Sequence, residues 1–187
     1  MYKLHPTLWR TCRMLSGQTR LELFRRIVAH PGLTVSDLAS QLRISLPRAS
    51  QELRRIQSRG LVQAERRGLF VRYRPEPDPS VPTAKPLLRA VQNSFQLDPA
   101  NDVLIAIAQA GSHARRLALL QLLLRGPWEL HELEEIAGMT HLTLQRNLRL
   151  LEKAGLIRRS DKTISLTETE HPLARCLLDL LGNRPVS

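Results

Sequence analysis

Aromatic residues are scarce in this chain, and it holds no long apolar run. Only two Trp, two Tyr and three Phe occur among 187 residues, so the core must consist mainly of Leu, Ile, Val and Ala, which favours packed helices. The richest apolar run, residues 117–124, includes Gln121 and is far shorter than the roughly 18 residues that a membrane helix needs. The first residues also lack the apolar core of a signal peptide. We therefore expect a cytoplasmic protein with no membrane partner.

Cysteine is rare, and the usual catalytic motifs are absent. Cys12 and Cys176 both lie in apolar patterns of helical spacing, which favours reduced core thiols over a disulfide or a metal site. The chain has no glycine-rich phosphate loop, no HExxH motif and no CxxC pair, and His113, His131 and His141 lack the spacing of metal ligands. The sequence therefore predicts no catalytic residue, no metal site, no cofactor and no enzymatic activity.

Acidic residues are scarce in the first part of the chain, whereas basic residues are abundant there. The whole chain carries 28 Lys and Arg against 17 Asp and Glu, a net charge of +11. Residues 1–74 hold 15 of these basic residues and 4 of the acidic ones. Residues 101–187 are nearly balanced, at 11 against 10. A compact basic domain attracts polyanions, so we expect nucleic acid as the partner, with an ordinary solvated basic surface as the alternative.

An internal repeat with an offset of 95 residues divides the chain. Leu53 corresponds to Leu148, and the run Gly60, Leu61 and Val62 corresponds to Gly155, Leu156 and Ile157. With a gap of one residue, residues 20–24 correspond to residues 116–120. Self-similarity of this kind indicates one structural unit used twice.

Each copy is expected to contain helices followed by a short hairpin. In the first copy, apolar spacing, capping residues and glycines predict helices at residues 18–29, 34–42 and 45–60, with a turn at 43–44. Strands are predicted at residues 61–65 and 69–74, joined at 66–68. Three helices followed by a hairpin is the order of a winged helix. The fold class that we predict is mainly α with small β-hairpin wings, as two tandem winged helix-turn-helix domains.

The predicted domain boundaries follow a proline-rich stretch that begins at Pro75. The first domain, basic and DNA-reading, is expected at residues 1–75, and a linker with a connecting helix at residues 76–98. The second domain is expected at residues 99–187, where residues 172–181 form a terminal amphipathic helix.

The helix that begins at Ser45 supplies the first set of candidate DNA-binding residues. If Ala49, Leu53 and Ile56 face the core, a period of 3.6 residues points the opposite residues outward. Arginine pairs well with guanine and glutamine with adenine in the major groove. The candidates on this helix are Ser45, Pro47, Arg48, Gln51, Arg54 and Arg55.

The predicted wing and the second copy supply the remaining candidates. A basic hairpin beside such a helix usually meets the DNA backbone or the minor groove, although a solvated charged hairpin is the alternative. The wing candidates are Arg66, Arg67, Arg72 and Arg74, and the second-copy candidates are Thr143, Gln145, Arg146 and Arg149. The second copy has Leu142 and Leu150 on its long helix, and a helix rich in glutamate precedes that helix. We therefore expect the second copy to serve assembly more than the reading of DNA. Whether it also binds DNA stays open.

The run over residues 17–75 resembles the ArsR-like winged-helix repressors. The resemblance is carried by the segments TVSDLA, SLPRASQELRRI, GLV and GLFVRY, and residues 111–167 look like a diverged second copy. It implies an operator-binding repressor that acts as a homodimer and is often controlled by a small-molecule effector, here unknown. The metal sensors of that family carry cysteines in the helix that here includes residues 35–39, or acidic and histidine ligands in the terminal helix. Neither set is present, so metal sensing is not expected.

The sequence thus favours a transcriptional regulator, most simply a repressor, that binds double-stranded DNA. Two alternatives use the same fold: a tandem winged-helix scaffold that binds a partner in a chromosome-organising complex, and a replication initiator. The concentration of positive charge in the first half favours the regulator, because a pure scaffold has no need of it. The operator sequence, the choice between repression and activation, and the oligomeric state stay open.

Overall fold

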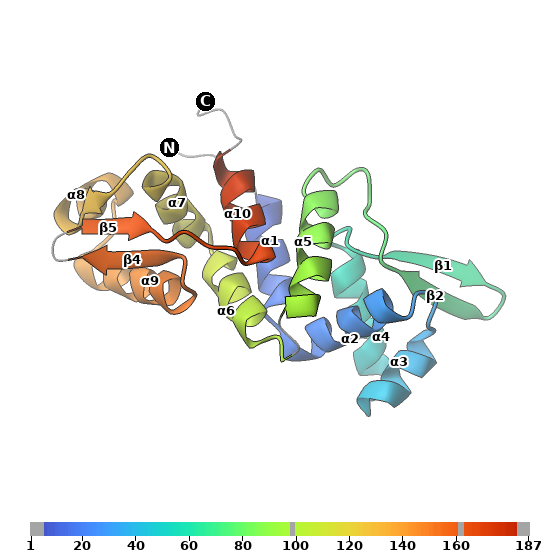
Figure 1. The fold of residues 1–187 in the computed structure, drawn as a ribbon. Coiled ribbons are helices and arrows are strands. Elements are labelled where there is room, and N and C mark those ends of the chain that lie inside the picture. The colour runs from blue at the N-terminus through green and yellow to red at the C-terminus, as the bar shows by residue number, and fades with distance from the viewer. Residues whose placement is uncertain (1–5, 98–99, 161–162, 183–187) are drawn as a thin grey trace. The chain divides into compact units, whose positions relative to one another are not determined.

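The computed structural model describes residues 6–97, 100–160 and 163–182, which form a mainly helical protein with two small antiparallel sheets (Figure 1). The chain divides into two compact units. Unit 2 is Gly17–Asn101, and unit 1 combines Met1–Ser16 with Asp102–Ser187. None of the helices in the described ranges is both long enough and apolar enough to cross a membrane.

In its described residues, unit 2 contains four helices and one hairpin. Its elements, in chain order, are α2 (Gln18–Ala29), α3 (Val35–Leu42), α4 (Leu46–Gln57), β1 (Gln63–Arg67), β2 (Phe70–Arg74) and α5 (Ala84–Leu97). Helix α4 packs against both α2 and α3, and α5 packs against α2. The core consists of aliphatic residues together with Tyr73, Phe24 and Phe95, and the rings of the two phenylalanines meet edge to face at 5.8 Å.

Local sequence signals fix the ends of α3 and α4. Thr34 and Asp37 form the predicted capping box, in which each side chain bonds the other residue's backbone N–H. Arg43 ends α3 in the left-handed region at φ 52°. Ser45 then caps α4 by accepting a hydrogen bond from the Arg48 backbone N–H at 3.4 Å. The chain therefore turns sharply between two helices that are both capped by side-chain oxygens.

The hairpin of unit 2 is longer at its tip than the sequence pattern predicts. Strand β1 runs to Arg67 and pairs with Phe70, so the turn consists of Gly68 and Leu69 instead of residues 66–68. Gly68 has φ 61°, which glycine adopts at no steric cost and which a tight turn of this kind requires. On its other side β2 makes a bridge from Arg72 to Thr34, just before α3.

Unit 1 begins with a helix from the start of the chain. Its elements are α1 (Pro6–Leu15), α6 (Asp102–Gly111), α7 (Ala114–Leu123), β3 (Trp128–Glu129), α8 (Leu130–Ala137), α9 (His141–Lys153), β4 (Ile157–Ser160), β5 (Thr163–Leu166) and α10 (Pro172–Gly182). The strands form an antiparallel sheet in the order β3-β5-β4. Helix α1 packs on α6, so closely that a Cβ added at Gly111 would lie 2.8 Å from the Cys12 Sγ.

The internal repeat is visible in backbone and burial. Gly60 and Gly155 both have positive φ, 72° and 69°, and the leucine after each is fully buried or nearly so. Arg43 and Gly138 end α3 and α8 with φ values of 52° and 59°. Both units also pair the residue before the short helix with the last strand of the hairpin. The sequence repeat is therefore a repeat of local structure.

The predicted domain boundaries differ from the units that form. Helix α1 was expected in the first domain, but Leu8, Cys12 and Leu15 are buried in unit 1, where α1 packs on α6. The predicted linker and connecting helix belong to unit 2. There the Asp78 backbone N–H donates to the Gly60 carbonyl at 2.8 Å, and Phe95 of α5 contacts Phe24. An amphipathic pattern shows that a helix needs a partner, but it does not say which one.

Candidate nucleic-acid interface

Helix α4 exposes the face that the sequence pattern points outward. It buries Ala49, Leu53 and Ile56 on the side toward α2 and α3. The opposite side lies in solvent because a helix repeats its faces every 3.6 residues. All six candidates of this segment are exposed: Ser45, Pro47, Arg48, Gln51, Arg54 and Arg55.

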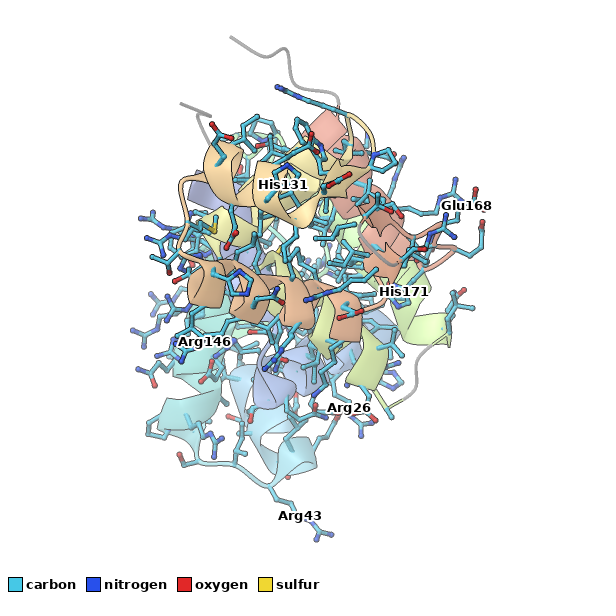
Figure 2. The ribbon with its side chains drawn as sticks, turned by 90° about the vertical axis from the view of Figure 1, so that its left-hand side faces the viewer. Arg26, Arg43, His131, Arg146, Glu168 and His171 are labelled. Atoms are coloured by element: carbon cyan, nitrogen blue, oxygen red, sulfur yellow. The ribbon has the colours of Figure 1, made fainter. Side chains whose placement is uncertain are left out.

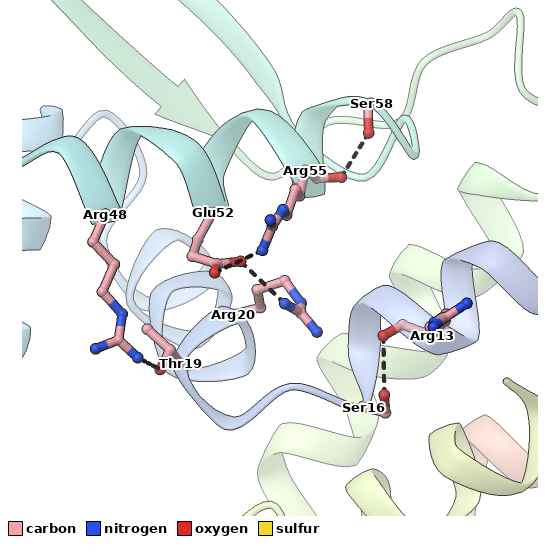
Figure 3. Close-up of polar contacts among 8 residues, drawn as sticks. All are labelled: Arg13, Ser16, Thr19, Arg20, Arg48, Glu52, Arg55 and Ser58. Carbon is pink, nitrogen blue, oxygen red and sulfur yellow. Dashed lines mark hydrogen bonds and ion pairs between the residues drawn. The ribbon is translucent and has the colours of Figure 1, made fainter.

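Two arginines on this face keep an uncompensated charge. The Arg48 guanidinium donates to Thr19 Oγ1 at 3.1 Å (Figure 3), and that of Arg54 donates to Ser50 Oγ at 3.1 Å. Both acceptors are neutral hydroxyls, so each bond orients the side chain without removing its positive charge. Gln51 lies between them in sequence and makes no polar side-chain contact within the described residues. This part of α4 presents two oriented cations and an amide that is able both to donate and to accept.

A buried carboxylate on α4 changes the role of Arg55. Glu52 accepts from Arg20 at 3.1 Å and from Arg55 at 2.9 Å (Figure 3), while its side chain is only 11% exposed. The charge of Arg55 is therefore partly neutralised, and its guanidinium is held toward α2. The sequence reasoning missed Glu52 and Arg20. The available signals were the spacing of three residues between Glu52 and Arg55 and the repeat match between Arg20 and Arg116.

The four arginines of the hairpin differ in their partners. Arg67 and Arg74 both pair with Glu65, at 2.8 and 3.3 Å, and Arg74 also lies 3.9 Å from Glu76. The Arg72 guanidinium donates to the Gly32 carbonyl at 2.9 Å. Arg66 is exposed and makes no polar side-chain contact within the part of the chain described.

The acidic residue at the centre of this hairpin stays ionised at neutral pH. The hydrogen bond from Arg67, together with the charges of Arg67, Arg74 and Arg72, lowers the pKa of the Glu65 carboxyl. It therefore offsets part of the positive charge of the hairpin. Arg66 is the hairpin arginine whose charge is the most available to an outside anion.

The turn before α4 contributes another cation, Arg43. The sequence pattern placed this residue in the turn but gave it no role in binding. Arg43 ends α3 with its side chain exposed, and Figure 2 shows it extending from the ribbon into solvent. It lies two residues before the cap of α4, so its charge adds to that of the N-terminal end of this helix. The signal was its position in the turn between the two helices.

The units share the excess charge more evenly than the sequence halves do. Unit 2 holds 14 Lys and Arg against 7 Asp and Glu, a net charge of +7. Unit 1 holds 14 against 10, a net charge of +4, because three basic residues of the first sixteen belong to it. Unit 2 nevertheless has the larger net positive charge, although it contains fewer residues than unit 1.

The second-copy candidates are only partly available. Arg146 and Arg149 are exposed on α9, whereas Thr143 is half-buried. Gln145 is also half-buried, and its side-chain carbonyl accepts from Arg159 at 2.7 Å. The same helix exposes Leu142 and Leu150, at 59% and 40%, where α4 carries Pro47 and Arg55. The surface of α9 thus combines Arg146, Arg149 and Lys153 with two exposed leucines, whereas α4 carries three arginines and exposes Leu46.

His113, His131 and His141 form pairs or caps, and no group of three potential metal ligands was found among the described residues. His113 caps α7 by accepting from the Arg115 backbone N–H at 3.1 Å. His131 lies 3.3 Å from Glu129, and His141 lies 2.7 Å from Glu134.

Comparison with known families concerns unit 1. The family model described as the HVO_A0261 N-terminal domain matches residues 105–182, which lie within unit 1 and make up less than half of the chain. No curated protein and no solved structure matches the chain. The matched range contains the second copy of the repeat, including α9, and excludes α4 and the hairpin of unit 2.

Proposed function

We propose that this protein is a DNA-binding transcriptional regulator that reads DNA with α4 of unit 2. The observation that carries this proposal is the outer face of α4, where Arg48, Gln51 and Arg54 are exposed and none of the three is paired with a carboxylate of the described residues. A helix with this surface fits the major groove, whose base edges match guanidinium and amide groups.

We also propose that each unit is a winged helix-turn-helix domain of the ArsR-like kind. The order of three helices and a hairpin in both copies supports this proposal, as does the sharp left-handed turn at Arg43 and at Gly138. The isolated bridge from Thr34 to Arg72 of β2 stands where unit 1 pairs β3 with β5, which supports the same arrangement in both copies. On this reading α4 is the recognition helix, and the hairpin β1–β2 is the wing.

The contacts of the cations support different proposed roles for them. Arg48 and Arg54 are candidates for guanine, and Gln51 for adenine, because bidentate pairing requires free guanidinium and amide edges. Arg43 and Arg66 are suited to phosphate, since each is exposed and uncompensated by a carboxylate. Arg55 contributes less than the sequence suggested because Glu52 already binds it.

A second candidate function is favoured by unit 1. Leu142 and Leu150 leave apolar surface exposed on α9, and Glu132 and Glu135 are exposed on the adjacent α8. Such a surface suits a protein partner better than phosphates. In a tandem winged-helix scaffold both units would bind protein partners, whereas in a regulator unit 1 would mediate assembly.

Selection of DNA fragments by the full-length protein at about 150 mM salt tests the proposal, because this salt concentration weakens non-specific binding. We expect the protein to enrich a defined sequence. Arg54→Ala should relax the preference at one or two positions and cost roughly ten- to a hundredfold in affinity for that sequence. Arg89→Ala is the matched control, because Arg89 is exposed on α5 of the same unit, outside α4 and the hairpin. If the wild type enriches no sequence, or if the two variants lose affinity equally, the proposal that α4 reads DNA is wrong.

A further inference from the structure

The tip of the unit 2 hairpin carries two exposed apolar side chains. Leu69 is 92% exposed and Phe70 is 57% exposed, although both stand in the most basic hairpin of the protein. Leu69 is the most exposed large apolar residue in the described ranges. Full exposure of a leucine forgoes roughly 1.5–3 kcal/mol of burial, so this side chain contributes nothing to the fold of the isolated chain.

The backbone holds these side chains in a defined place. The pairing of the hairpin continues to Arg67 and Phe70, and Gly68 and Leu69 complete a two-residue turn. A short turn of this kind is rigid compared with a long loop, because both its ends are fixed by the strand pairing. Leu69 therefore projects from the end of a paired hairpin, with Phe70 beside it.

The second copy of the repeat has a polar sequence at the same place. Ser160 pairs with Thr163 there as Arg67 pairs with Phe70 in unit 2, and the sequence between them reads Asp161-Lys162 instead of Gly68-Leu69. The apolar tip thus belongs to the unit with the larger positive charge and the basic α4. This coincidence points to an occupant that is both anionic and able to accept an apolar wedge.

We propose that Leu69, supported by Phe70, inserts between two base pairs in the minor groove and kinks the DNA. This inference rests on the proposed function and deepens it, since it states how the hairpin would engage the DNA that α4 reads. Charge complementarity favours DNA as the occupant, because Arg66 and Arg67 precede the tip on β1, and the exposed Arg66 suits a phosphate beside the groove. Unstacking one base step costs a few kcal/mol, and the closer approach of the basic hairpin to the backbone offsets that cost.

The test uses the full-length protein and the DNA fragment that it selects. Dyes at the two ends of the fragment report bending by energy transfer, and 2-aminopurine placed at successive steps reports unstacking by its fluorescence. We expect the wild type to bend the fragment by roughly 20–90° and to raise the fluorescence at one step. Leu69→Ala combined with Phe70→Ala should remove both signals and weaken binding roughly tenfold. The salt dependence should become slightly weaker, because the basic hairpin no longer approaches the DNA backbone as closely.

Two further variants separate the tip from general effects. Leu97→Ala removes an apolar side chain that is 66% exposed on α5 of the same unit, and it should leave the bend intact. Leu69→Ser changes a residue whose side chain is 92% exposed, so we expect this variant to fold normally. It should still reduce the bend and the 2-aminopurine signal.

The outcomes distinguish this inference from the proposed function. If the protein selects a defined sequence but does not bend it, or if the bend survives the double substitution, the insertion of Leu69 is wrong. The proposal that α4 reads DNA is not affected by either outcome. Selection of no sequence overturns the proposed function itself. If the double substitution instead abolishes self-association in sedimentation without DNA, or binding to vesicles of anionic phospholipid, the tip is a protein or membrane contact and the inference is wrong.

Discussion

Arg20 of α2 donates to Glu52 of α4 at 3.1 Å, and the two side chains are 21% and 11% exposed. In the second copy the equivalent residues are Arg116 and Asn147, whose guanidinium and side-chain carbonyl lie 3.4 Å apart. In both copies an arginine of the first helix, α2 or α7, thus contacts the inner face of the long helix, α4 or α9. Only unit 2 uses a carboxylate there, and this carboxylate also holds Arg55.

Replacing Glu52 with Gln should destabilise unit 2 by about 1–2 kcal/mol, because two partly buried guanidinium groups would lose their charged partner. The expected loss of stability is smaller than for a fully buried ion pair, because water still reaches Arg20. Urea unfolding followed by far-UV circular dichroism measures the change. Glu65→Gln is the control on the exposed hairpin and should alter stability little. Equal stability of the wild type and the Glu52 variant would show that this pair only orients Arg55.

The close approach of Cys12 to Gly111 should make Gly111→Ala destabilising by about 1–3 kcal/mol, because the added Cβ would overlap the sulfur atom. Both tryptophans, Trp9 and Trp128, lie in unit 1, so their fluorescence during urea unfolding reports on this unit.

Gly182→Ala is the matched control for this prediction. It lies in α10, where the nearest atom to an added Cβ is 3.9 Å away, and alanine there should be neutral or slightly stabilising. Cys12→Ala combined with Gly111→Ala should recover part of the loss. An unchanged transition in the single Gly111 variant would contradict the packing of α1 on α6.

Arg43→Gly should stabilise unit 2 by up to about 1 kcal/mol, because φ 52° is strained for a residue with a Cβ and the equivalent position of unit 1 is already glycine. Thermal unfolding by circular dichroism measures this effect, with Gly138→Ala expected to destabilise unit 1 by a similar amount. If Arg43 binds phosphate as proposed, the same variant should weaken DNA binding at every sequence. A variant that loses stability would indicate that the side chain, rather than the backbone, governs this turn.

His113 should make the stability of unit 1 depend on pH. Burial, followed by the charges of Arg116, Arg115 and Arg13, lowers the pKa of this histidine below its ordinary value of 6.5. The unfolded chain therefore binds a proton before the folded one does, and stability falls as the pH drops from about 6.5 toward the lower folded pKa. His113→Asn keeps an acceptor at the cap of α7 and cannot be protonated. Tryptophan fluorescence in urea at pH 7.5 and 5.0 should show a larger loss for the wild type than for this variant, and equal losses would contradict the prediction.

Arg66→Ala should weaken DNA binding more than Arg67→Ala, because Glu65 already neutralises part of the charge of Arg67. Affinity measured at several salt concentrations should give a slope lower by about 1 for the Arg66 variant and by less for the Arg67 variant. The two substitutions remove the same side chain from neighbouring positions, so each controls for the other. A larger effect of the Arg67 variant would mean that DNA displaces Glu65.

Much of the local structure of unit 2 followed from sequence signals that act over a few residues. The capping box of Thr34 and Asp37, the cap at Ser45 and the left-handed Gly60 depend on hydrogen bonds and backbone sterics between near neighbours. The exposure of the outer face of α4 followed from the helical period. These features could be predicted because each one is decided locally.

Contacts between distant residues could not be predicted in the same way. The pairing of Glu52 with Arg20 spans 32 residues, and the division of labour among the hairpin arginines depends on the strand register around Glu65. The turn lies at Gly68 and Leu69 instead of residues 66–68, so Leu69, which the pattern put in a strand, stands at the tip. Alternation of apolar and polar residues along the strands does not by itself place the turn, which depends on the register of the hairpin.

The sequence by itself determined that the chain repeats one helical unit, that its acidic residues are few near the start, and where α4 begins and which face it exposes. Only the tertiary structure decided that α1 joins unit 1, that α5 joins unit 2, and which arginines keep a free charge. The reason is physical: caps, turns and helical faces are set by neighbouring residues, whereas an apolar stripe or a guanidinium accepts any suitable partner that folding brings to it.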